Sequence, residues 1–348
     1  MVDRLGAPVR AAVVGTGLIG GSVLLRLHAA GLDVIGWDPD EVTRHQARRI
    51  GVPAPDRLVD AVADRDVVFL CGPLPTLPDT LVEVAAATAD GCVLTDVGST
   101  KAELAAFATA RGLAHRFVPG HPMAGTDRAG LAAAVPDLFD GAAWVLCPAP
   151  GPGLAAFRWL TALVVDVFAA RVVPMAADRH DAVVALASHV PHLLAGALAG
   201  ATDRSPLRDA VLALAAGSFR DGTRVAGTPP ERTANMLLGN RAEILDALGS
   251  VTAFLDELAG ALRAGDRAAL TARHGEGRDA RVALAGRPTV RLRPRFPLVP
   301  DAAELAFLHA LGAAGGHLDG CRTDGDEVEY SARRLTVERG GPPTPPLG

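Results

Sequence analysis

Residues 10–22 read RAAVVGTGLIGGS: a short apolar run, a glycine-rich turn, and the start of an apolar pattern at helical spacing. The helical pattern continues to Gly31, and a second apolar run, DVIGWD, follows at residues 33–38. Short apolar runs bounded by glycine turns are typical of buried strands. The stretch therefore predicts a strand–turn–helix–strand unit, the first unit of a parallel sheet.

The alternation of strand and helix patterns continues to about residue 175. Alternation of this kind is typical of a parallel sheet that is covered by helices on both faces. We therefore predict an α/β domain of the Rossmann type over residues 1–175. Its further strands are expected within residues 66–73, 92–98, 115–122, 142–148 and 170–175.

The chain changes character after this domain. Residues 176–286 carry long helical patterns rich in Ala and Leu, which predict a second, all-α domain. Its helices are too apolar to stand alone, so we expect them to bury that surface in a homodimer. Residues 287–341 mix strand and helix patterns and predict a small α+β segment. The Pro- and Gly-rich end, residues 342–348, is predicted to be disordered.

The composition excludes several classes of function. The 348 residues have a net charge of −5 with both signs mixed, so no basic tract favours nucleic-acid binding. The four cysteines are scattered without a CxxC pair, as is typical of reduced thiols in a cytoplasmic protein. No charge-free apolar run of about 18 residues predicts a membrane span. No metal site is expected, because the HxxH pair at residues 189–192 has no obvious third ligand.

The glycine turn has the chemistry of a dinucleotide site. In its G-x-G-x-x-G pattern, Gly15 allows the tight turn, Gly17 lets the backbone approach a pyrophosphate, and Gly20 lets helix and strand pack closely. The free N–H groups at the helix start stabilise the anion. Asp38 ends the second strand, where a carboxylate binds ribose hydroxyls and repels a 2′-phosphate. The cofactor is therefore predicted to be NAD, and Arg44 is expected to lie too far along the next helix to favour NADP.

Further cofactor contacts are expected at the carboxyl ends of neighbouring strands, where sheets of this type bind ligands. The stretch CGPLP at residues 71–75 ends one such strand. The expected set comprises Leu18, Ile19, Gly72, Pro73, Asp96 and Gly98 in addition to the three glycines and Asp38.

Four other stretches place His, Ser, Asp or Arg beside Gly or Pro: DVGSTK (96–101), GHPMAGTDRAG (120–130), HDAVVALASHVPHLLAGAL (180–198) and GSFRDGTRVAGT (217–228). With GLIGGS (17–22), their order and spacing resemble the prephenate/arogenate dehydrogenase family over roughly residues 10–285. The resemblance implies that a ring alcohol is oxidised by NAD, the ring carboxylate leaves as carbon dioxide, and the ring becomes aromatic. The protein would mainly position the substrate and remove a proton.

Three residues are expected to carry this reaction. Oxidation of an alcohol requires a base, and a neutral imidazole acts near pH 7, so His121 in the HPMAG motif is the candidate. Ser99 matches a family serine that hydrogen-bonds the histidine and the substrate hydroxyl. Arg224 matches the family arginine that binds a carboxylate of the dianionic substrate, for which a guanidinium is suited. Arg220 is expected to pair with Asp221 or another carboxylate instead.

Four residues complete the expected substrate site. The resemblance directs His192 toward the substrate side chain and adds His189, whereas two satisfied core histidines beside a kink at Pro191 are the alternative interpretation. Thr126 and Asp127 lie in the loop of the candidate base. Asp127 stands where many relatives have Glu, and its side chain is one methylene shorter.

Two positions depart from or add to the family pattern. Lys101, the one lysine of the chain, is expected either near the mouth of the site, where it would attract an anion, or on a helix surface. Thr233 stands where some relatives have Trp, so that aromatic wall is missing or supplied elsewhere.

The stretch VPDAAELAFLHALGAAGG (299–316) resembles a degenerate regulatory module of the ACT type. Ala302 and Ala303 replace a Pro and a Gly at the point where a ligand approaches the backbone in that module. We therefore expect an ACT-like fold in the C-terminal segment but no working feedback through it.

The residues leave the substrate open. Oxidation of prephenate to 4-hydroxyphenylpyruvate in tyrosine biosynthesis is the leading hypothesis. Arogenate, or an analogue such as 4-amino-4-deoxyprephenate in specialised metabolism, is the alternative. A third hypothesis, a non-catalytic NADH sensor, would be favoured by loss of His121, Ser99 or Arg224, and all three are present.

Overall fold

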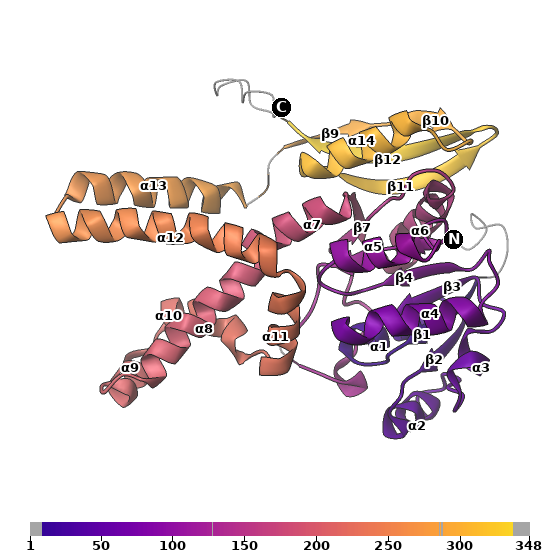
Figure 1. The fold of residues 1–348 in the computed structure, drawn as a ribbon, viewed down its shortest axis with the longest axis horizontal. Helices are drawn as coiled ribbons and strands as arrows, with labels where there is room; N and C mark the ends of the chain where they lie inside the picture. The colour runs from indigo at the N-terminus through magenta and orange to yellow at the C-terminus, as the bar shows by residue number, and fades with distance from the viewer. Residues whose placement is uncertain (1–8, 127, 285, 287, 337–348) are drawn as a thin grey trace.

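A computed structural model describes residues 9–126, 128–284, 286 and 288–336. Its N-terminal half contains a five-stranded parallel sheet in the order β2-β1-β3-β4-β5 (Figure 1). The strand order reverses between β1 and β3, which is where sheets of this type bind ligands at their carboxyl edge. The strands are β1 (Arg10–Val14), β2 (Asp33–Trp37), β3 (Val67–Leu70), β4 (Val93–Asp96) and β5 (Phe117–Val118).

Helices cover both faces of this sheet, so its central strands are buried completely. Every residue of β3 and β4 is buried. This explains why β3 is a continuous apolar run, whereas β4 ends in the buried polar residues Thr95 and Asp96. The predicted Rossmann-type domain is thereby confirmed. The connecting helices are α1 (Leu18–Ala29), α2 (Glu41–Arg49), α3 (Leu58–Val62), α4 (Leu77–Ala87) and α5 (Ala102–Ala110).

A second sheet carries at one edge the strand that begins the histidine loop, GHPMAGTDRAG (residues 120–130). Its order is β10-β12-β11-β8-β7-β6, and β9 also pairs with β12. The edge strand β6 (Gly120–Pro122) contains His121 and runs antiparallel to β7 (Ala143–Leu146). Strand β8 (Arg171–Pro174) pairs parallel to β7, and the buried helix α6 (Gly153–Phe168) connects them.

Four aromatic side chains join the two sheets. Phe69 on β3, Trp144 on β7, Phe168 at the end of α6 and Phe139 are each at most 1% exposed. Their ring centroids lie 5.0 to 6.4 Å apart in tilted or edge contacts. Each such pair contributes about 0.5–1.5 kcal/mol beyond its buried area. Since β6 pairs with β7, this cluster also holds the histidine strand against the parallel sheet.

The C-terminal segment confirms the predicted small α+β unit, and its strands extend the second sheet. Leu318 of β11 pairs antiparallel to Val172 of β8. The stretch HLDGCRTD has no apolar alternation that would predict strand β11, and pairing with β12 along its length makes it a strand. The elements are β9 (Thr289–Leu292), β10 (Arg295–Pro297), α14 (Ala302–Ala313), β11 (His317–Asp324) and β12 (Glu327–Leu335).

Two contacts attach α14 to the N-terminal domain. The buried carboxylate of Glu304 accepts hydrogen bonds from Arg158 of α6, with Nε at 2.8 Å, and from the Tyr330 hydroxyl at 2.6 Å. A buried carboxylate requires such partners to offset its desolvation. Gly312 packs directly on the Pro174 carbonyl, which a Cβ at this position would overlap. Glu304, the glutamate of the VPDAAEL stretch, thus joins the C-terminal segment to the N-terminal domain.

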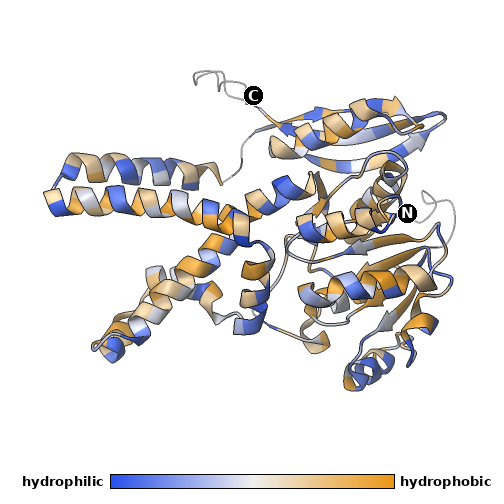
Figure 2. Ribbon diagram, in the orientation of Figure 1, coloured by the Kyte–Doolittle hydropathy of each residue, from blue (hydrophilic) through white to orange (hydrophobic). Residues whose placement is uncertain are grey.

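The chain between Ala177 and Ala283 is helical, which confirms the predicted all-α domain. Helices α12 and α13 lie antiparallel and project away from the sheets, and α8 and α9 form a second projection (Figure 1). Apolar residues recur along both projections (Figure 2). The elements are α7 (Ala177–Val184), the π-helix η4 (Ala185–His189), α8 (Val190–Asp203), α9 (Arg208–Leu214), α10 (Gly217–Thr223), η5 (Arg224–Gly227), α11 (Pro230–Gly239), α12 (Arg241–Ala264) and α13 (Arg267–Ala283).

The packing of α14 on β8 predicts opposite effects for two Gly→Ala substitutions. Gly312→Ala should lower the free energy of unfolding by about 1–3 kcal/mol, because the added methyl overlaps the Pro174 carbonyl. Gly277→Ala on α13 has open space around its Cβ and should raise stability by up to about 1 kcal/mol through helix propensity. Denaturant unfolding of both variants tests this. Equal stabilisation by the two would contradict the close packing of Gly312 on Pro174.

Candidate active site

The first βα turn has the geometry that a dinucleotide phosphate requires. Gly15 has a φ of +92°, which favours glycine, and its N–H donates to the Trp37 carbonyl at 2.7 Å. A Cβ on Gly20 would overlap the Gly15 oxygen, so α1 packs against the turn only with glycine there. At Gly17 no heavy atom lies within 4 Å of a Cβ position, and no side chain caps α1. The helix start therefore has open space and free N–H groups for an anion.

Asp38 lies beside this turn, directly after β2. Its Oδ2 accepts a hydrogen bond from the Thr16 N–H at 2.7 Å, and its Oδ1 accepts one from the Asp40 N–H at 3.0 Å. These bonds hold the carboxylate next to the glycine turn, where the motif requires an acceptor for ribose hydroxyls. The residues present therefore fit a bound dinucleotide.

Arg44 lies closer to Asp38 than the sequence suggested. Helix α2 begins at Glu41 and turns back over β2, so Arg44 Nη1 donates to the Asp38 carbonyl at 2.8 Å. The guanidinium also donates to the Pro39 carbonyl and pairs with Asp56, with Nε and Oδ1 3.7 Å apart. Arg44 is thus adjacent to the carboxylate but engaged by its own loop.

The buried carboxylate of Asp96 joins the two loops that carry the predicted catalytic residues. Its Oδ2 accepts a hydrogen bond from the Gly98 N–H at 2.8 Å, and its Oδ1 accepts one from the Gly120 N–H at 3.1 Å. These donors directly precede Ser99 and His121 in the chain. One carboxylate at the end of β4 thereby positions both segments.

The expectation that Lys101 lies at the mouth of the site or on a helix surface is wrong. Lys101 is fully buried, and its ammonium group donates to Oδ2 of Asp96. The physical reason is that a buried carboxylate with two main-chain donors still requires a counter-charge. The lysine follows Asp96 by five residues and reaches it from the other end of the β4–α5 loop.

His121 contacts a histidine to which the sequence analysis gave no role. His121 Nδ1 lies 2.9 Å from His180 Nε2, and His180 Nδ1 lies 2.7 Å from Oδ1 of Asp181. The two imidazole rings meet nearly edge to face. His180 and Asp181 are almost completely buried on α7. The available signal was a His–Asp pair directly before the mostly apolar run AVVALAS (182–188).

Asp181 is itself fixed by the helix that follows the Asp96 loop. Its two carboxylate oxygens accept hydrogen bonds from the N–H groups of Lys101 and Ala102, each at 2.8 Å. These groups lie at the start of α5 and have no partner within that helix. The positive end of the helix dipole therefore stabilises the buried carboxylate.

The surroundings of His121 keep its imidazole neutral. Burial lowers the pKa of His121 well below its ordinary value, and the nearby His180, Lys101 and His189 lower it further. No hydrogen bond among the described residues engages its Nε2. A half-buried neutral imidazole with one free nitrogen can accept a proton from a substrate hydroxyl.

His189 is completely buried at the end of the π-helix. Asn240 donates from Nδ2 to the Asp181 carbonyl at 2.7 Å and to His189 Nδ1 at 3.1 Å. Because a carbonyl only accepts, Nδ2 must face both groups, and the proton of His189 then sits on Nε2. Within the described residues that Nε2 has no partner. It is a buried donor that a ligand oxygen or a water can satisfy.

The other predicted substrate residues lie at the surface of the described structure. Ser99 is partly exposed, and Thr126 is exposed. His192 is partly exposed, and its Nδ1 lies 2.8 Å from the Ser188 carbonyl. Asp127 lies outside the described residues. The structure thus brings His121 and His189 into one cluster.

The arginines of the SFRDGTR stretch are free in the described part of the chain. Arg224 is exposed at the start of η5, and Arg220 is exposed on α10. No ion pair between described residues includes either one, so the expected carboxylate partner of Arg220 is not found there. A third arginine, Arg232 on α11, comes close to the histidine loop. Its Nη2 lies 4.0 Å from a Cβ position on Gly125, and the sequence analysis did not assign it.

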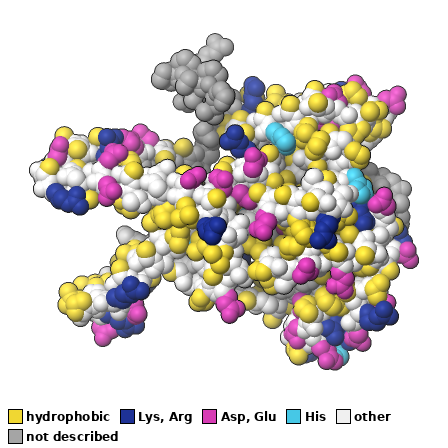
Figure 3. Space-filling view, viewed as in Figure 1, with side chains coloured by type: hydrophobic (Ala, Val, Ile, Leu, Met, Phe, Trp, Pro, Cys, Tyr) yellow, Lys and Arg dark blue, Asp and Glu magenta, His cyan; other side chains and the backbone are white. Residues whose placement is uncertain are grey.

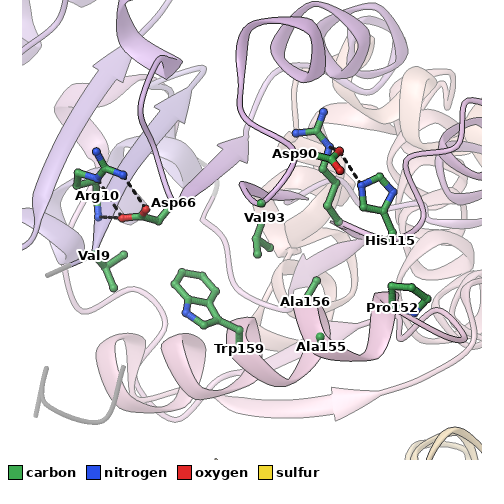
Figure 4. A pocket seen from close by; sticks show the side chains of 12 residues that line it. Val9, Arg10, Asp66, Asp90, Val93, His115, Pro152, Ala155, Ala156 and Trp159 are labelled. Atoms are coloured by element: carbon green, nitrogen blue, oxygen red, sulfur yellow. Dashed lines mark hydrogen bonds and ion pairs between the residues drawn. The ribbon is translucent and has the colours of Figure 1, made fainter. Parts of the chain in front are cut away.

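A hollow of about 590 Å³ lies at the opposite, amino-terminal edge of the parallel sheet (Figure 4). Trp159 forms part of its wall. Its charged side chains are paired with one another: Arg10 Nη2 lies 3.0 Å from Asp66 Oδ1, and His115 Nε2 lies 3.0 Å from Asp90 Oδ1. Ligands of such sheets bind at the carboxyl edge, so this hollow is separate from the candidate site.

Two further features bear on the class of protein. Among the described residues, no group of three or more His, Cys, Asp or Glu is placed to hold a metal ion. One continuous helical stretch, Ala177–Asp203, is long and apolar enough to cross a membrane by length and composition alone, which is weak evidence. It contains the buried His180, Asp181 and His189, which are bonded within the protein.

The fold and the site together define a two-domain oxidoreductase with a nucleotide-binding domain. The family model described as "Prephenate dehydrogenase, nucleotide-binding domain" matches residues 22–173. The model described as "Prephenate dehydrogenase, dimerization domain" matches residues 176–274. The chain therefore belongs to the prephenate dehydrogenase family.

Individual relatives agree with this assignment. The cyclohexadienyl dehydrogenase of Zymomonas mobilis is 31% identical over 279 residues, which cover 78% of this chain and 95% of that protein. The prephenate dehydrogenase of Bacillus subtilis is 34% identical over 241 residues, which cover 67% of this chain and 65% of that protein.

Solved structures show the same fold. A candidate prephenate dehydrogenase of Corynebacterium glutamicum has a TM-score of 0.73 at 32% identity and covers 80% of this chain and 90% of its own. The arogenate dehydrogenase of Synechocystis has a TM-score of 0.68 at 27% identity and covers 79% and 100%. For the fold alone, an Aquifex aeolicus prephenate dehydrogenase in complex with hydroxyphenyl propionate and NAD+ has a TM-score of 0.72 at 24% identity and covers 80% and 99%.

The buried histidines predict that stability falls in acid. Burial lowers the pKa of His189 to about 4 and that of His121 well below its ordinary value, whereas both are near 6.5 when unfolded. The unfolded chain therefore binds more protons below pH 6.5. Stability is complete above that pH and is lost as the pH falls toward the folded values, by about 1.4 kcal/mol per pH unit for each histidine.

Denaturant unfolding of the wild type and His189→Gln between about pH 7 and pH 5 tests this. Gln keeps an acceptor for Asn240 but does not titrate, so its curve should be flatter. His115→Gln removes a histidine from the surface and should keep the wild-type slope. A wild-type slope in His189→Gln would contradict the prediction.

Proposed function

We propose that the protein is an NAD-dependent prephenate dehydrogenase that forms 4-hydroxyphenylpyruvate in tyrosine biosynthesis. The observation that carries the proposal is the state of His121. It is neutral and half-buried, its Nδ1 is bonded to His180, and its Nε2 is free of bonds among the described residues. The same carboxylate, Asp96, holds the strand of His121 and the loop of Ser99.

In the proposed reaction, His121 Nε2 takes the proton of the substrate hydroxyl, and Ser99 orients that hydroxyl. The dinucleotide, when bound at Gly15, Gly17, Gly20 and Asp38, supplies the acceptor for the hydride. The ring carboxylate leaves as carbon dioxide, and aromatisation makes the step irreversible. Because that driving force belongs to the substrate, the protein contributes orientation and a base of suitable pKa.

Arginines are proposed to bind the carboxylates of the substrate. Arg224 is the proposed ligand, and its guanidinium is free of ion pairs among the described residues. Arg232 near Gly125 provides a second cation beside the histidine loop. His189 Nε2–H and His192 are proposed to contact substrate oxygens, together with Thr126 and Asp127.

NAD is proposed as the cofactor on the basis of Asp38. Its carboxylate stands next to the glycine turn and would repel the phosphate that distinguishes NADP. The neighbouring Arg44 is occupied by main-chain oxygens and Asp56, so it does not neutralise that carboxylate. The Aquifex aeolicus relative was solved with NAD+, which agrees with this choice.

Arogenate, or a ring-substituted prephenate, is the alternative substrate. The Synechocystis relative is an arogenate dehydrogenase, and the Zymomonas relative is a cyclohexadienyl dehydrogenase. Thr233 stands where some relatives have Trp, so that aromatic wall is missing or supplied elsewhere in this site. A test with all three substrate types is therefore needed.

We further propose a cytoplasmic homodimer formed through the helical domain. The second family model describes a dimerization domain, and hydrophobic side chains are exposed over the helical projections (Figure 3). Large exposed apolar surface on a soluble protein favours association. Leucines at least half exposed in this region are Leu186, Leu207, Leu214, Leu238, Leu245, Leu255, Leu262 and Leu284.

The proposed reaction predicts NAD reduction with one of three substrates: prephenate, arogenate or 4-amino-4-deoxyprephenate. His121→Asn should lower kcat by about 10²–10⁴-fold, because it removes the base, while NADH binding persists. His115→Asn, at the opposite edge of the sheet, should leave kcat unchanged. Absence of turnover with all three substrates, despite NADH binding, would favour the sensor hypothesis.

The choice of cofactor predicts the effect of Asp38→Ser. Loss of the carboxylate should lower the ratio of kcat/KM for NAD to that for NADP by at least about tenfold, because charge-assisted bonds to ribose are lost and repulsion of the phosphate ends. Asp40→Ser, in the same loop, keeps a capping group for α2 and should not change the ratio. An unchanged ratio in Asp38→Ser would show that the carboxylate does not select the cofactor.

A further inference from the structure

We propose that His180 is a positioning residue that fixes His121 in the tautomer of a base, with its proton on Nδ1 and its lone pair on Nε2. The proposal rests on the proposed role of His121 and adds the residues that prepare it. It concerns a chain of three side chains, His121, His180 and Asp181, that lead from the site into the helical domain.

The direction of the hydrogen bonds follows from the buried end of this chain. An ionised carboxylate only accepts, so His180 Nδ1, 2.7 Å from Oδ1 of Asp181, must donate. A neutral His180 then has its lone pair on Nε2. His121 Nδ1, 2.9 Å from that atom, must donate in turn. A neutral imidazole has one proton, so His121 is left with a free lone pair on Nε2.

Asp181 is held so that this order cannot easily reverse. Both of its carboxylate oxygens accept main-chain N–H groups at the start of α5. Its own carbonyl accepts the Asn240 side chain at 2.7 Å. The carboxylate is 4% exposed, and its donors at the helix start hold it oriented toward His180.

Charged and titratable groups from the other packed elements oppose a second positive charge on the histidine pair. The Lys101 ammonium faces the site from the β4–α5 loop and is balanced by Asp96 of β4. His189 faces it from the π-helix, and the buried Cys147 follows β7 near Lys101 and Asp181. Asp96 is already paired with Lys101. Positive charges on both His121 and His180 would therefore have to share Asp181 as their counter-charge among the described carboxylates.

The neighbouring histidine shows that tautomers are assigned individually in this cluster. Asn240 donates to His189 Nδ1 and thereby places the proton of His189 on Nε2. His121 has the opposite arrangement, because its Nδ1 faces an acceptor. One imidazole is thus prepared to accept a proton from substrate and the other to donate a hydrogen bond. Reversal of His121 would convert the base into a donor.

Kinetics of His180→Leu and His180→Gln test the proposal. Leu fills space but offers no acceptor, so kcat should fall at least about tenfold while KM for the substrate and NADH binding change little. Gln can accept from His121 and donate to Asp181, so it should restore part of the loss. A role in packing alone predicts that Gln restores nothing relative to Leu. His115→Leu, which breaks a surface His–Asp pair, is the matched control and should be neutral.

The pH profile of kcat provides a second readout of the same variants. In the wild type the neutral His121 persists to low pH. In His180→Leu the acidic limb of the kcat profile should move to higher pH, because the neighbouring His180 that lowers the pKa of His121 is lost. Equal losses in the Leu and Gln variants, or no loss in either, would overturn the proposal.

The tautomer can also be read without turnover. Long-range ¹H–¹⁵N spectra of the full-length protein with ¹⁵N-labelled histidine, with and without NAD+, report which ring nitrogen carries the proton. The signals of His121 are identified by their loss in His121→Asn. We expect a protonated Nδ1 and a bare Nε2 near pH 7; a proton on Nε2 would overturn the proposal. If no substrate is turned over, the proposed function fails, and the spectra still decide the tautomer.

Discussion

The geometry of the site depends on the buried carboxylate of Asp96. Three donors meet where β4 ends, and this carboxylate accepts hydrogen bonds from all of them: the N–H groups of Gly98 and Gly120 and the ammonium group of Lys101. The β4–α5 loop and the edge strand β6 are thereby joined, although they belong to different sheets. Removing the charge would leave the lysine buried without a partner, which costs several kcal/mol. The positions of Ser99 and His121 therefore depend on Asp96, which is itself fully buried.

A second buried carboxylate, that of Asp181, makes a similar set of hydrogen bonds in the helical domain. Asp181 accepts from the N–H groups at the start of α5 and from His180, so it links the nucleotide-binding domain to α7. Asn240, at the start of α12, binds both the Asp181 carbonyl and His189. The histidines are held from behind by groups that the substrate does not touch. Such preorganisation lets a base act without rearrangement of its surroundings during the reaction.

The C-terminal segment is attached to this framework through β8. Its sheet continues the second sheet of the N-terminal domain, and Glu304 and Gly312 bind it to α6 and Pro174. Pro174 lies three residues before α7, which carries His180 and Asp181. The family models end at residue 274, so this segment lies beyond them. In the stretch that resembles an ACT module, the glutamate holds the fold together, and the two alanines occupy the first turn of α14.

The sequence by itself determined the Rossmann-type domain, the helical domain and the dinucleotide turn. The domains depend on local periodicity, and the turn depends on a local glycine pattern in which Gly20 packs on the Gly15 oxygen. It also singled out His121, through its glycine-rich loop. The tertiary structure decided what surrounds that histidine. The burial of Lys101, the contact of His180, the donor state of His189 and the approach of Arg232 all join residues from separate elements. Likewise, β11 exists only because β12 and β8 supply its partners. Local patterns carry no information on such pairings, because the free energy that selects them comes from desolvation of charges and from main-chain bonds formed only when distant segments meet.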